Sequence, residues 1–171
     1  MMDLSASAPL RGSRAYIGLG SNLGDSLQTL RAATGRLASL GTVTGASQVY
    51  ESEPLGFEAQ PVFRNAVVAL DTTLAPLALL DALLAIEAEF KRERAVRWGP
   101  RTLDLDLIWY SGLEMEGDRL TLPHARAHQR EFVLRPLADL AHALPLAGSS
   151  VTELLEALPP QGVRATGDHL M

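Results

Sequence analysis

The sequence predicts an α+β fold in which an antiparallel sheet is covered by helices on one face. Short apolar stretches rich in β-branched residues are interleaved with longer stretches of helical periodicity. The chain has 171 residues, of which 47% are hydrophobic, and this suits one domain with a buried core. Glycine and proline separate the stretches, and we find no internal repeat and no interior linker.

The first half of the chain contains three of the predicted strands. Residues 15–19 form a short apolar strand between glycines. Asp25, with Gln28 three residues later, is typical of a helix start, and an apolar stripe runs through the helix that follows. Residues 43–50 and 65–70 suit a second and a third strand because they are rich in β-branched and small residues.

The second half begins with a helix. Pro76 fits a first helical position, and leucines with helical spacing follow it. Residues 103–110 form the fourth strand, and a hairpin through Gly112 and Gly117 comes next. Two further helices are predicted near residues 131–140 and 151–158. The order β-α-β-β-α-β, plus these additions, is that of a ferredoxin-like sandwich.

Length and composition limit the domain organisation and the class of protein that this sequence can form. We expect a loose N-terminal leader at residues 1–13, a single domain at 14–159 and a loose C-terminal tail at 160–171. No apolar stretch is long enough to span a membrane, and the N-terminus does not resemble a secretory signal. The absence of cysteine excludes disulfides and agrees with a cytoplasmic protein. The net charge of −5 argues against a general nucleic-acid binder.

Two aspartates alternate with leucines along the fourth predicted strand. Because strand side chains alternate between faces, the leucines are expected in the core, and Asp104 and Asp106 share the opposite face, about 6.6 Å apart along the backbone. Aspartate is disfavoured in strands, and neighbouring carboxylates repel each other unless a dication binds them. Mg²⁺ commonly uses one or two carboxylates together with substrate phosphates. A solvated acidic face is the alternative that the pair alone leaves open.

The segment before this strand is basic. Residues 91–101 contain five basic residues and one acid, an excess that needs an anion or solvent in an acidic protein. Guanidinium groups pair with phosphate oxygens, and Trp98 offers a flat face to an aromatic ring. Arg92 and Arg94 are expected where the preceding helix ends, so a solvated helix terminus is their alternative. The basic segment and the acid pair together favour a phosphate–metal site.

Other residues are ambiguous when taken singly. Core packing is the favoured interpretation of Phe63 and Phe132. A lone loop histidine such as His124 is more often a bystander than a participant. Asn65, at the start of the third strand, can both donate and accept hydrogen bonds and so suits the edge of a heterocycle.

Several stretches, in this order, resemble the family of 6-hydroxymethyl-7,8-dihydropterin pyrophosphokinases. The strongest is RWGPRTLDLDLI at residues 97–108. The others are AYIGLGSNLGD at 15–25, YESEPLG at 50–56, FRNA at 63–66 and LTLPHARAHQREFVLRPL at 120–137. The resemblance implies a ferredoxin-like fold and transfer of pyrophosphate from ATP to the pterin in folate biosynthesis.

The resemblance also implies the site residues. Two Mg²⁺ ions would be held by Asp104 and Asp106, with ATP as co-substrate. The implied catalytic residues are Arg92, Arg94, Arg101, Asp104 and Asp106. The implied ATP-binding residues are Glu87, Arg92, Arg101, Arg119, His124 and Arg130. The implied pterin-binding residues are Ser52, Pro54, Leu55, Asn65, Trp98, Asp104 and Phe132. Phe132 would stack on the ring, opposite an aromatic residue at or near Tyr50.

The sequence departs from the family pattern at three positions. Ala125 follows His124 where proline or tyrosine is more frequent, which removes an ATP-side contact. Lys91 precedes the first loop arginine where glycine is common, which stiffens the loop. Glu53 replaces a proline of some members, although acidic residues are also frequent there. None of the three removes an aspartate or a signature arginine.

Two alternatives compete with this interpretation. One is another Mg²⁺-dependent nucleotidyl or phosphoryl transferase, since acids and arginines occur together in many such sites. The other is a ferredoxin-like module that binds a small anion without catalysis, which the two strand aspartates oppose. We expect a monomeric enzyme that acts on small molecules and binds neither nucleic acid nor a membrane.

Overall fold

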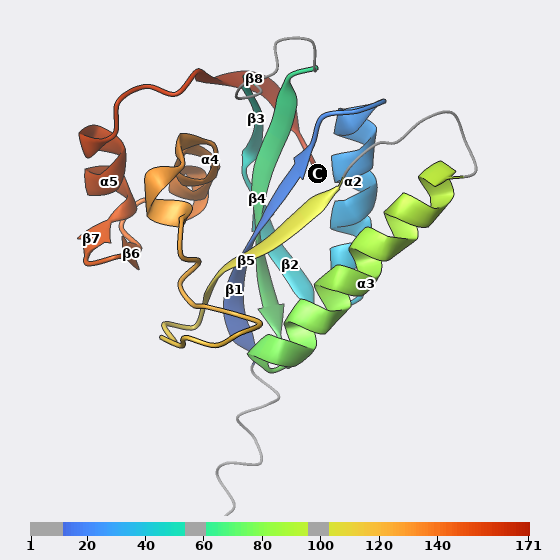
Figure 1. Ribbon diagram of the computed structural model, residues 1–171, viewed down its shortest axis with the longest axis horizontal. Helices are drawn as coiled ribbons and strands as arrows, with labels where there is room; N and C mark the ends of the chain where they lie inside the picture. Colours follow the sequence, from blue (N-terminus) through green and yellow to red (C-terminus); the bar gives the residue numbers. More distant parts are fainter. Residues whose placement is uncertain (1–11, 54–60, 96–102) are drawn as a thin grey trace, which may run out of the picture.

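The computed structural model describes residues 12–53, 61–95 and 103–171 (Figure 1). Within these ranges the strands of the main sheet are β1 (Ser13–Ser21), β2 (Thr42–Ala46), β3 (Gln48–Ser52), β4 (Phe63–Thr72), β5 (Asp104–Tyr110) and β8 (Val163–His169). They lie in the order β5-β1-β4-β3-β8, and β2 also pairs with β4. Every pairing is antiparallel. The predicted ferredoxin-like fold is confirmed.

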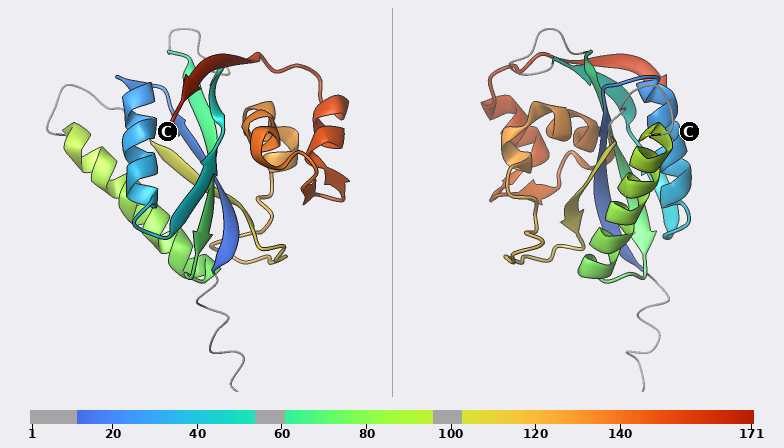
Figure 2. Two further views of the ribbon diagram at one scale, coloured as in Figure 1. Left: turned by 180° about the vertical axis from the view of Figure 1, so that it is seen from behind. Right: turned by 45° about the vertical axis from the view of Figure 1, so that its right-hand side comes forward.

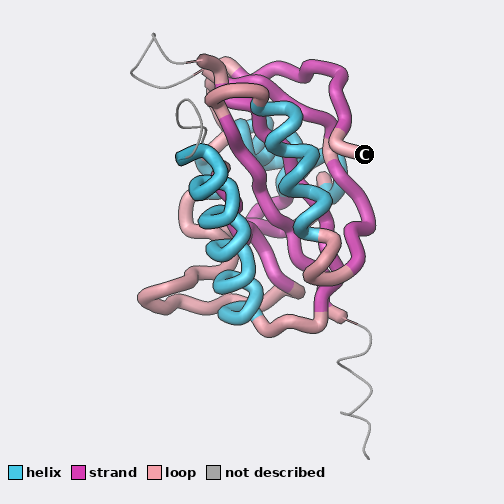
Figure 3. Tube along the Cα trace, turned by 90° about the vertical axis from the view of Figure 1, so that its right-hand side faces the viewer, coloured by secondary structure: helices cyan, strands magenta, loops and turns pink. Residues whose placement is uncertain are grey.

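Helices lie on both faces of this sheet. Helices α2 (Ser26–Leu37) and α3 (Pro76–Ala95) lie side by side over one face (Figure 3). Helices α4 (Glu131–Ala141) and α5 (Val151–Ala157) lie on the other side, as the views in Figure 2 show. The 3₁₀ turn η1 (Ala127–Gln129) leads into α4, and the short hairpin of β6 (Pro145–Leu146) and β7 (Ser149–Ser150) connects α4 to α5. No helix within the described ranges combines the length and hydrophobicity that a bilayer crossing requires.

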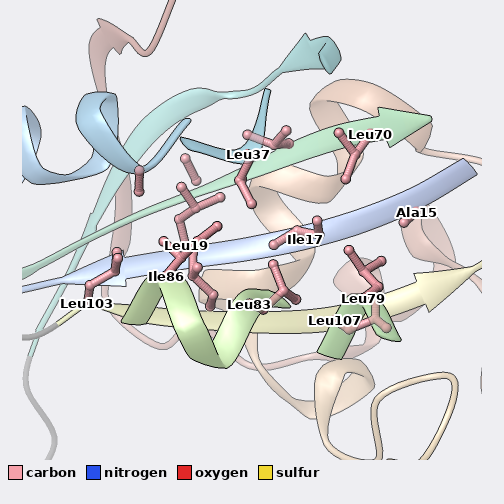
Figure 4. Packing of buried hydrophobic residues seen from close by; sticks show 14 of the residues in the cluster. Ala15, Ile17, Leu19, Leu37, Leu70, Leu79, Leu83, Ile86, Leu103 and Leu107 are labelled. Atoms are coloured by element: carbon pink, nitrogen blue, oxygen red, sulfur yellow. The ribbon is translucent and has the colours of Figure 1, made fainter. Parts of the chain in front are cut away.

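The larger core lies between the sheet and the pair α2 and α3. Alternate strand residues such as Ile17, Leu105 and Leu107 are buried against leucines of both helices, and Figure 4 shows several of these contacts. Leu103, Leu105 and Leu107 are all buried in this core, which confirms the predicted alternation along the fourth strand. Burial of apolar surface stabilises a fold by about 25 cal/mol per Å², and this layer holds the larger of the two clusters of buried residues.

A second core lies on the opposite face, and here the prediction of helices on one face only is wrong. Val67 and Ile108 of the sheet pack against Val133, Leu134 and Leu137 of α4. All residues of β4 from Asn65 to Leu70 are therefore buried, and those from Ala66 to Leu70 are apolar on both faces. A strand that is buried on both faces requires such a continuous apolar run.

Local signals define the helix starts well. The Asp25 carboxylate accepts a hydrogen bond from the Gln28 backbone N–H at 3.1 Å, as an N-cap should. Helix α3 begins at Pro76 as predicted but extends to Ala95, through Arg92 and Arg94, where the sequence was expected to leave the helix. Lysine, arginine, glutamate and alanine are strong helix formers, and they continue α3.

Two strands replace the single one predicted at residues 43–50. The break falls at Ser47, whose hydroxyl accepts a hydrogen bond from the Val67 N–H at 2.9 Å while its own N–H donates to the Val67 carbonyl at 2.8 Å. A side chain thus takes the place of a backbone acceptor in the ladder, and β2 and β3 pair with different parts of β4. The predicted hairpin after β5 turns at Gly112 and is held by a bridge between Met115 and Leu122.

The C-terminal segment 160–171 was expected to be loose, and the structure differs. Residues Val163–His169 form β8 and pair antiparallel with β3. The Thr166 hydroxyl donates to the Val49 carbonyl at 2.8 Å, and Leu170 is buried in the larger core. The sequence of β8 contains an arginine, an aspartate, a histidine and a glycine among its seven residues, so it has little intrinsic strand preference and its pairing with β3 defines it.

Candidate active site

A cavity of about 840 Å³ lies on the face of the sheet that carries α4. Its floor includes Gly18, Gly20, Asp104, Asp106 and Ile108 from the neighbouring strands β1 and β5. Residues of β3 and β4 line a second part of the cavity. The side opposite the sheet is formed by η1, the start of α4 and residues 160–163. The cavity therefore joins the strand aspartates to the residues around Asn65 and Phe132 in one continuous space.

The two aspartates lie opposite glycines. In the register of β1 with β5, Gly18 pairs with Asp106 and Gly20 pairs with Asp104. A Cβ atom at Gly18 would lie 3.2 Å from Ile108 Cδ1, and one at Gly20 would lie 3.2 Å from Asn65 Oδ1. The glycines thus keep the strand face beside the carboxylates free of side chains, as a site that receives a ligand needs.

This donor set fits Mg²⁺. Asp104 is exposed and Asp106 is half-buried, and both line the cavity. Carboxylate oxygens are the hard ligands that Mg²⁺ prefers, and the ion usually keeps further positions for substrate phosphates and water. Among the residues that the structure describes, no group of three or more acidic, histidine or cysteine side chains could hold a metal ion. A cation here would draw its remaining ligands from the bound substrate.

Glu87 supports this strand from the side of α3. Its carboxylate accepts a hydrogen bond from the Leu105 backbone N–H at 2.7 Å, between the two aspartates. Strand β5 is first in the sheet order, so this N–H has no strand partner on that side within the described ranges. Burial raises the pKa of Glu87, and the charges of Asp104 and Asp106 add to the rise. Glu87 does not line the cavity, in contrast to the ATP contact that the resemblance implied.

Asn65 is held by Ser52 at the other end of the cavity. Its Nδ2 donates to the Ser52 hydroxyl at 2.9 Å, and both side chains are buried. This bond fixes the amide orientation, because the nitrogen has a partner and Oδ1 lies near Gly20 on the cavity floor. A heterocycle with an N–H at its edge would find a fixed acceptor here.

Two phenylalanines line the cavity, and Tyr50 does not. Phe132 follows the start of α4, and Phe63 starts β4, next to Ser52 in the strand register. Tyr50 instead donates its hydroxyl to Asp139 of α4 at 2.9 Å, and burial raises its pKa to about 12. The aromatic residue expected at or near Tyr50 is therefore not Tyr50 itself, and Phe63, for which core packing was the favoured interpretation, lines the cavity instead.

His124 and Arg130 line the cavity together with the two aspartates. His124 Nδ1 accepts a hydrogen bond from the Arg126 N–H at 3.2 Å, so the neutral ring carries its proton on Nε2. Burial lowers the pKa of His124, with Arg130 and Arg126 acting in the same direction against Asp106. The histidine is thus a neutral donor near pH 7. The Arg130 guanidinium lies over the Phe132 ring at 5.6 Å.

The remaining predicted residues fall into two groups. Arg119 pairs with Asp81 of α3 and does not line the cavity. The side chains of Arg92 and Arg94 lie outside the described part of the chain, as do Pro54, Leu55, Trp98 and Arg101.

Several residues that line the cavity were not predicted from the sequence to do so: Phe63, Glu53, Gln129, Pro160, Gln161 and Val163. The phenylalanine was visible beside Asn65, but no local signal marks the C-terminal residues.

Comparison with known proteins gives a consistent result. The chain matches the family model of 7,8-dihydro-6-hydroxymethylpterin-pyrophosphokinase (HPPK) over residues 16–142. It is 48% identical over 153 residues to the 2-amino-4-hydroxy-6-hydroxymethyldihydropteridine pyrophosphokinase of Pseudomonas aeruginosa, across 88% of this chain and 94% of the relative. The relative of the same name from Methylorubrum extorquens is 44% identical over 153 residues, across 88% of this chain and 97% of the relative.

Solved structures agree on the fold. The HPPK-DHPS of Plasmodium falciparum, solved as an A437G variant with STZ-DHP, matches with a TM-score of 0.67 at 14% identity. The match covers 91% of this chain and 47% of the Plasmodium chain, so the present chain spans less than half of that protein. The chain belongs to the 7,8-dihydro-6-hydroxymethylpterin-pyrophosphokinase family.

Proposed function

We propose that the chain transfers the pyrophosphoryl group of ATP to the hydroxymethyl group of 6-hydroxymethyl-7,8-dihydropterin, a step of folate biosynthesis. One observation carries the proposal. A single cavity of about 840 Å³ contains the acid pair of β5 at one end and the Asn65–Ser52 pair with two phenylalanines at the other. A flat heterocycle and a polyphosphate chain need these two kinds of surroundings side by side.

The pterin occupies the end formed by β3, β4 and the start of α4. Phe63 and Phe132 supply aromatic faces for the ring. Asn65, with its amide fixed by Ser52, bonds the polar edge of the ring. Pro54, Leu55 and Trp98 complete the pterin contacts in the family resemblance, and Asp104 lies toward the reacting hydroxyl.

ATP occupies the end that contains Asp104, Asp106, His124 and Arg130. The neutral His124 ring donates from Nε2 and Arg130 supplies positive charge, so both suit phosphate oxygens. Arg92, Arg94 and Arg101 add further guanidinium groups from the basic segment. Two Mg²⁺ ions held by Asp104 and Asp106 would neutralise the phosphate charge and hold the reacting oxygens in line when bound.

The reaction is an in-line displacement at the β-phosphorus of ATP. A bond forms between the pterin hydroxymethyl oxygen and the β-phosphorus, and the bond from this phosphorus to the α,β-bridging oxygen breaks. AMP leaves with that oxygen, and the hydroxyl proton is released to water. Such transfers need positioning and charge neutralisation more than covalent participation of the protein. The cavity has this character, because its residues bind the two reactants from opposite ends and bring the hydroxyl toward the phosphates.

The product identifies the reaction. Purified protein is incubated with ATP, Mg²⁺ and 6-hydroxymethyl-7,8-dihydropterin, and the nucleotide products are separated. The proposal predicts AMP and the pterin diphosphate in equal amounts. ADP would indicate an ordinary kinase, and absence of turnover would favour a binding module; either result contradicts the proposal.

We further propose that the chain works as a monomer in the cytoplasm, on small molecules and without nucleic acid. The net charge of −5 argues against nucleic-acid binding, and the absence of cysteine agrees with the cytoplasm. Sedimentation equilibrium should give the mass of one chain, 18.4 kDa, and twice that mass would refute the monomer.

A further inference from the structure

Gln161 is bonded at three points to the junction of η1 and α4. Its side-chain Oε1 accepts from the Glu131 N–H at 2.9 Å, and its Nε2 donates to the Gln129 carbonyl at 3.1 Å. Its own backbone N–H donates to the Glu131 carboxylate at 2.7 Å. These bonds join residues that are 30 and 32 positions apart, so they fix the C-terminal segment against the start of α4.

Glu131 is the centre of this arrangement. It is 5% exposed, and its carboxylate also receives Arg135 at 2.9 Å. Glu131 is the first residue of α4, so its backbone N–H is one of the donors that the helix itself cannot satisfy. The N-cap residue of α4, Arg130, makes no side-chain cap bond, and the Gln161 amide supplies the missing acceptor from another part of the chain.

The residues on each side of Glu131 belong to the active site. Arg130 and Phe132 both line the cavity, and the Arg130 guanidinium lies over the Phe132 ring. A shift of the Glu131 backbone would therefore move both side chains. Phe132 is more sensitive because its ring moves rigidly with two torsions, whereas the longer Arg130 side chain can compensate through its additional rotatable bonds.

The C-terminal segment is itself a wall of the cavity. Pro160, Gln161 and Val163 line it, and Val163 lies opposite Ser52 in the register of β8 with β3. The segment thus connects the strand that carries Ser52 to the helix that presents Phe132. Gly162 follows Gln161 and has φ +79°, and a Cβ there would lie 3.2 Å from Glu53 Cγ, so the chain passes close to the end of β3 directly after Gln161.

We propose that Gln161 is a positioning residue for the pterin ring. Its bonds to Glu131 and Gln129 set the distance between the C-terminal wall and the start of α4, and thereby the place of the Phe132 face. The inference rests on the proposed function for the identity of the ring. It assigns a role in substrate binding to a segment that lies beyond the residues matched by the family model, 16–142.

The test is Gln161→Ala, measured by steady-state kinetics and by equilibrium binding of the pterin through its own fluorescence. The variant loses the two side-chain hydrogen bonds that hold the C-terminal wall against α4, and relaxation of the segment recovers part of the lost binding energy. We expect the KM and the Kd for the pterin to rise about five- to tenfold, with kcat and the KM for ATP within about twofold of the wild type. A purely structural residue would lower the melting temperature without this selective rise.

Thr166→Val is the matched control. Thr166 anchors the same strand, since its hydroxyl donates to the Val49 carbonyl at 2.8 Å, but it does not line the cavity. This variant should lower the melting temperature by a similar amount and leave the pterin KM unchanged. Gln161→Asn retains the amide on a shorter side chain and should give an intermediate pterin Kd, and it serves as the second variant if Gln161→Ala does not fold.

The outcomes separate the inference from the function. If the wild type binds the pterin but forms no AMP, the proposed function fails, while the ratio of the pterin Kd values still decides the role of Gln161. If Gln161→Ala and Gln161→Asn both bind the pterin as the wild type does, the positioning role is overturned. An equal rise of the pterin Kd in Thr166→Val would overturn the positioning role as well, because the change in binding would then follow from lower stability alone.

Discussion

A Cβ atom at Gly20 of β1 would lie 3.2 Å from Oδ1 of Asn65, its partner in the strand register. The amide oxygen that is proposed to bond the pterin edge therefore lies in space that only glycine leaves free. The same glycine faces Asp104 on the other side, so it separates the ring-binding amide from the first carboxylate of the acid pair.

Gly20→Ala should weaken pterin binding because the new methyl group pushes the Asn65 amide from its place. We expect the Kd for the pterin to rise about tenfold, which corresponds to about 1.4 kcal/mol. The melting temperature should change by only a few degrees, since alanine is tolerated in strands. Gly35→Ala in α2 is the control, because a Cβ at Gly35 would meet nothing within 4 Å. It should stabilise the helix by about 0.5–1 kcal/mol and leave pterin binding unchanged.

Glu87 should contribute to stability through the edge of the sheet. Glu87→Ala leaves the Leu105 N–H beside α3 without its acceptor, and an unpaired buried donor costs about 1–3 kcal/mol. Glu87→Gln keeps an amide oxygen in place of the carboxylate and should lose less than about 1 kcal/mol. Urea unfolding of the two variants measures the difference.

Glu89→Ala serves as the control for this pair. Glu89 lies on α3, as Glu87 does, and forms an exposed ion pair with Arg36 of α2. Its replacement should lower the free energy of unfolding less than Glu87→Ala does. Equal losses for Glu87→Ala and Glu87→Gln would show that the charge matters, and that the acceptor for Leu105 does not.

His124 should make the stability of the ligand-free protein depend on pH. Burial holds the pKa of His124 below the ordinary 6.5, so as the pH falls through this value the unfolded chain binds a proton before the folded chain does. The free energy of unfolding therefore decreases from about pH 6.5 down to the folded pKa, and this group has no effect above that window. His124→Gln should show a flatter decrease between about pH 7 and about pH 5 in denaturant titrations. Parallel curves for the two proteins would exclude a lowered pKa at His124.

Local patterns were sufficient for the central part of the fold and of the site. The alternation of leucine and aspartate along β5 predicted which side chains are buried and which line the cavity, because side-chain direction in a strand has a fixed period of two. The helix start at Asp25 was predicted for the same kind of reason, since an N-cap is a relation between residues three positions apart.

Long-range relations were not predictable in this way. Strand β8 has a polar sequence and exists through its pairing with β3, more than a hundred residues earlier. Gln161 enters the site only because that pairing brings it to Glu131. The sequence favoured core packing for Phe63 and an aromatic partner at or near Tyr50, whereas the Tyr50 hydroxyl bonds Asp139 on α4 and Phe63 lines the cavity. Arg119 pairs with Asp81 on α3, a contact that no spacing reveals.

The acid pair is the central claim, and Asp106→Asn tests it most directly. The variant retains the size of the side chain and removes the charge that is proposed to hold Mg²⁺. AMP formation is measured with saturating ATP and pterin over a range of Mg²⁺ concentrations, together with pterin binding. The account predicts a fall in kcat of at least about a hundredfold with pterin binding nearly unchanged. Turnover close to that of the wild type, with the same Mg²⁺ dependence, would contradict it.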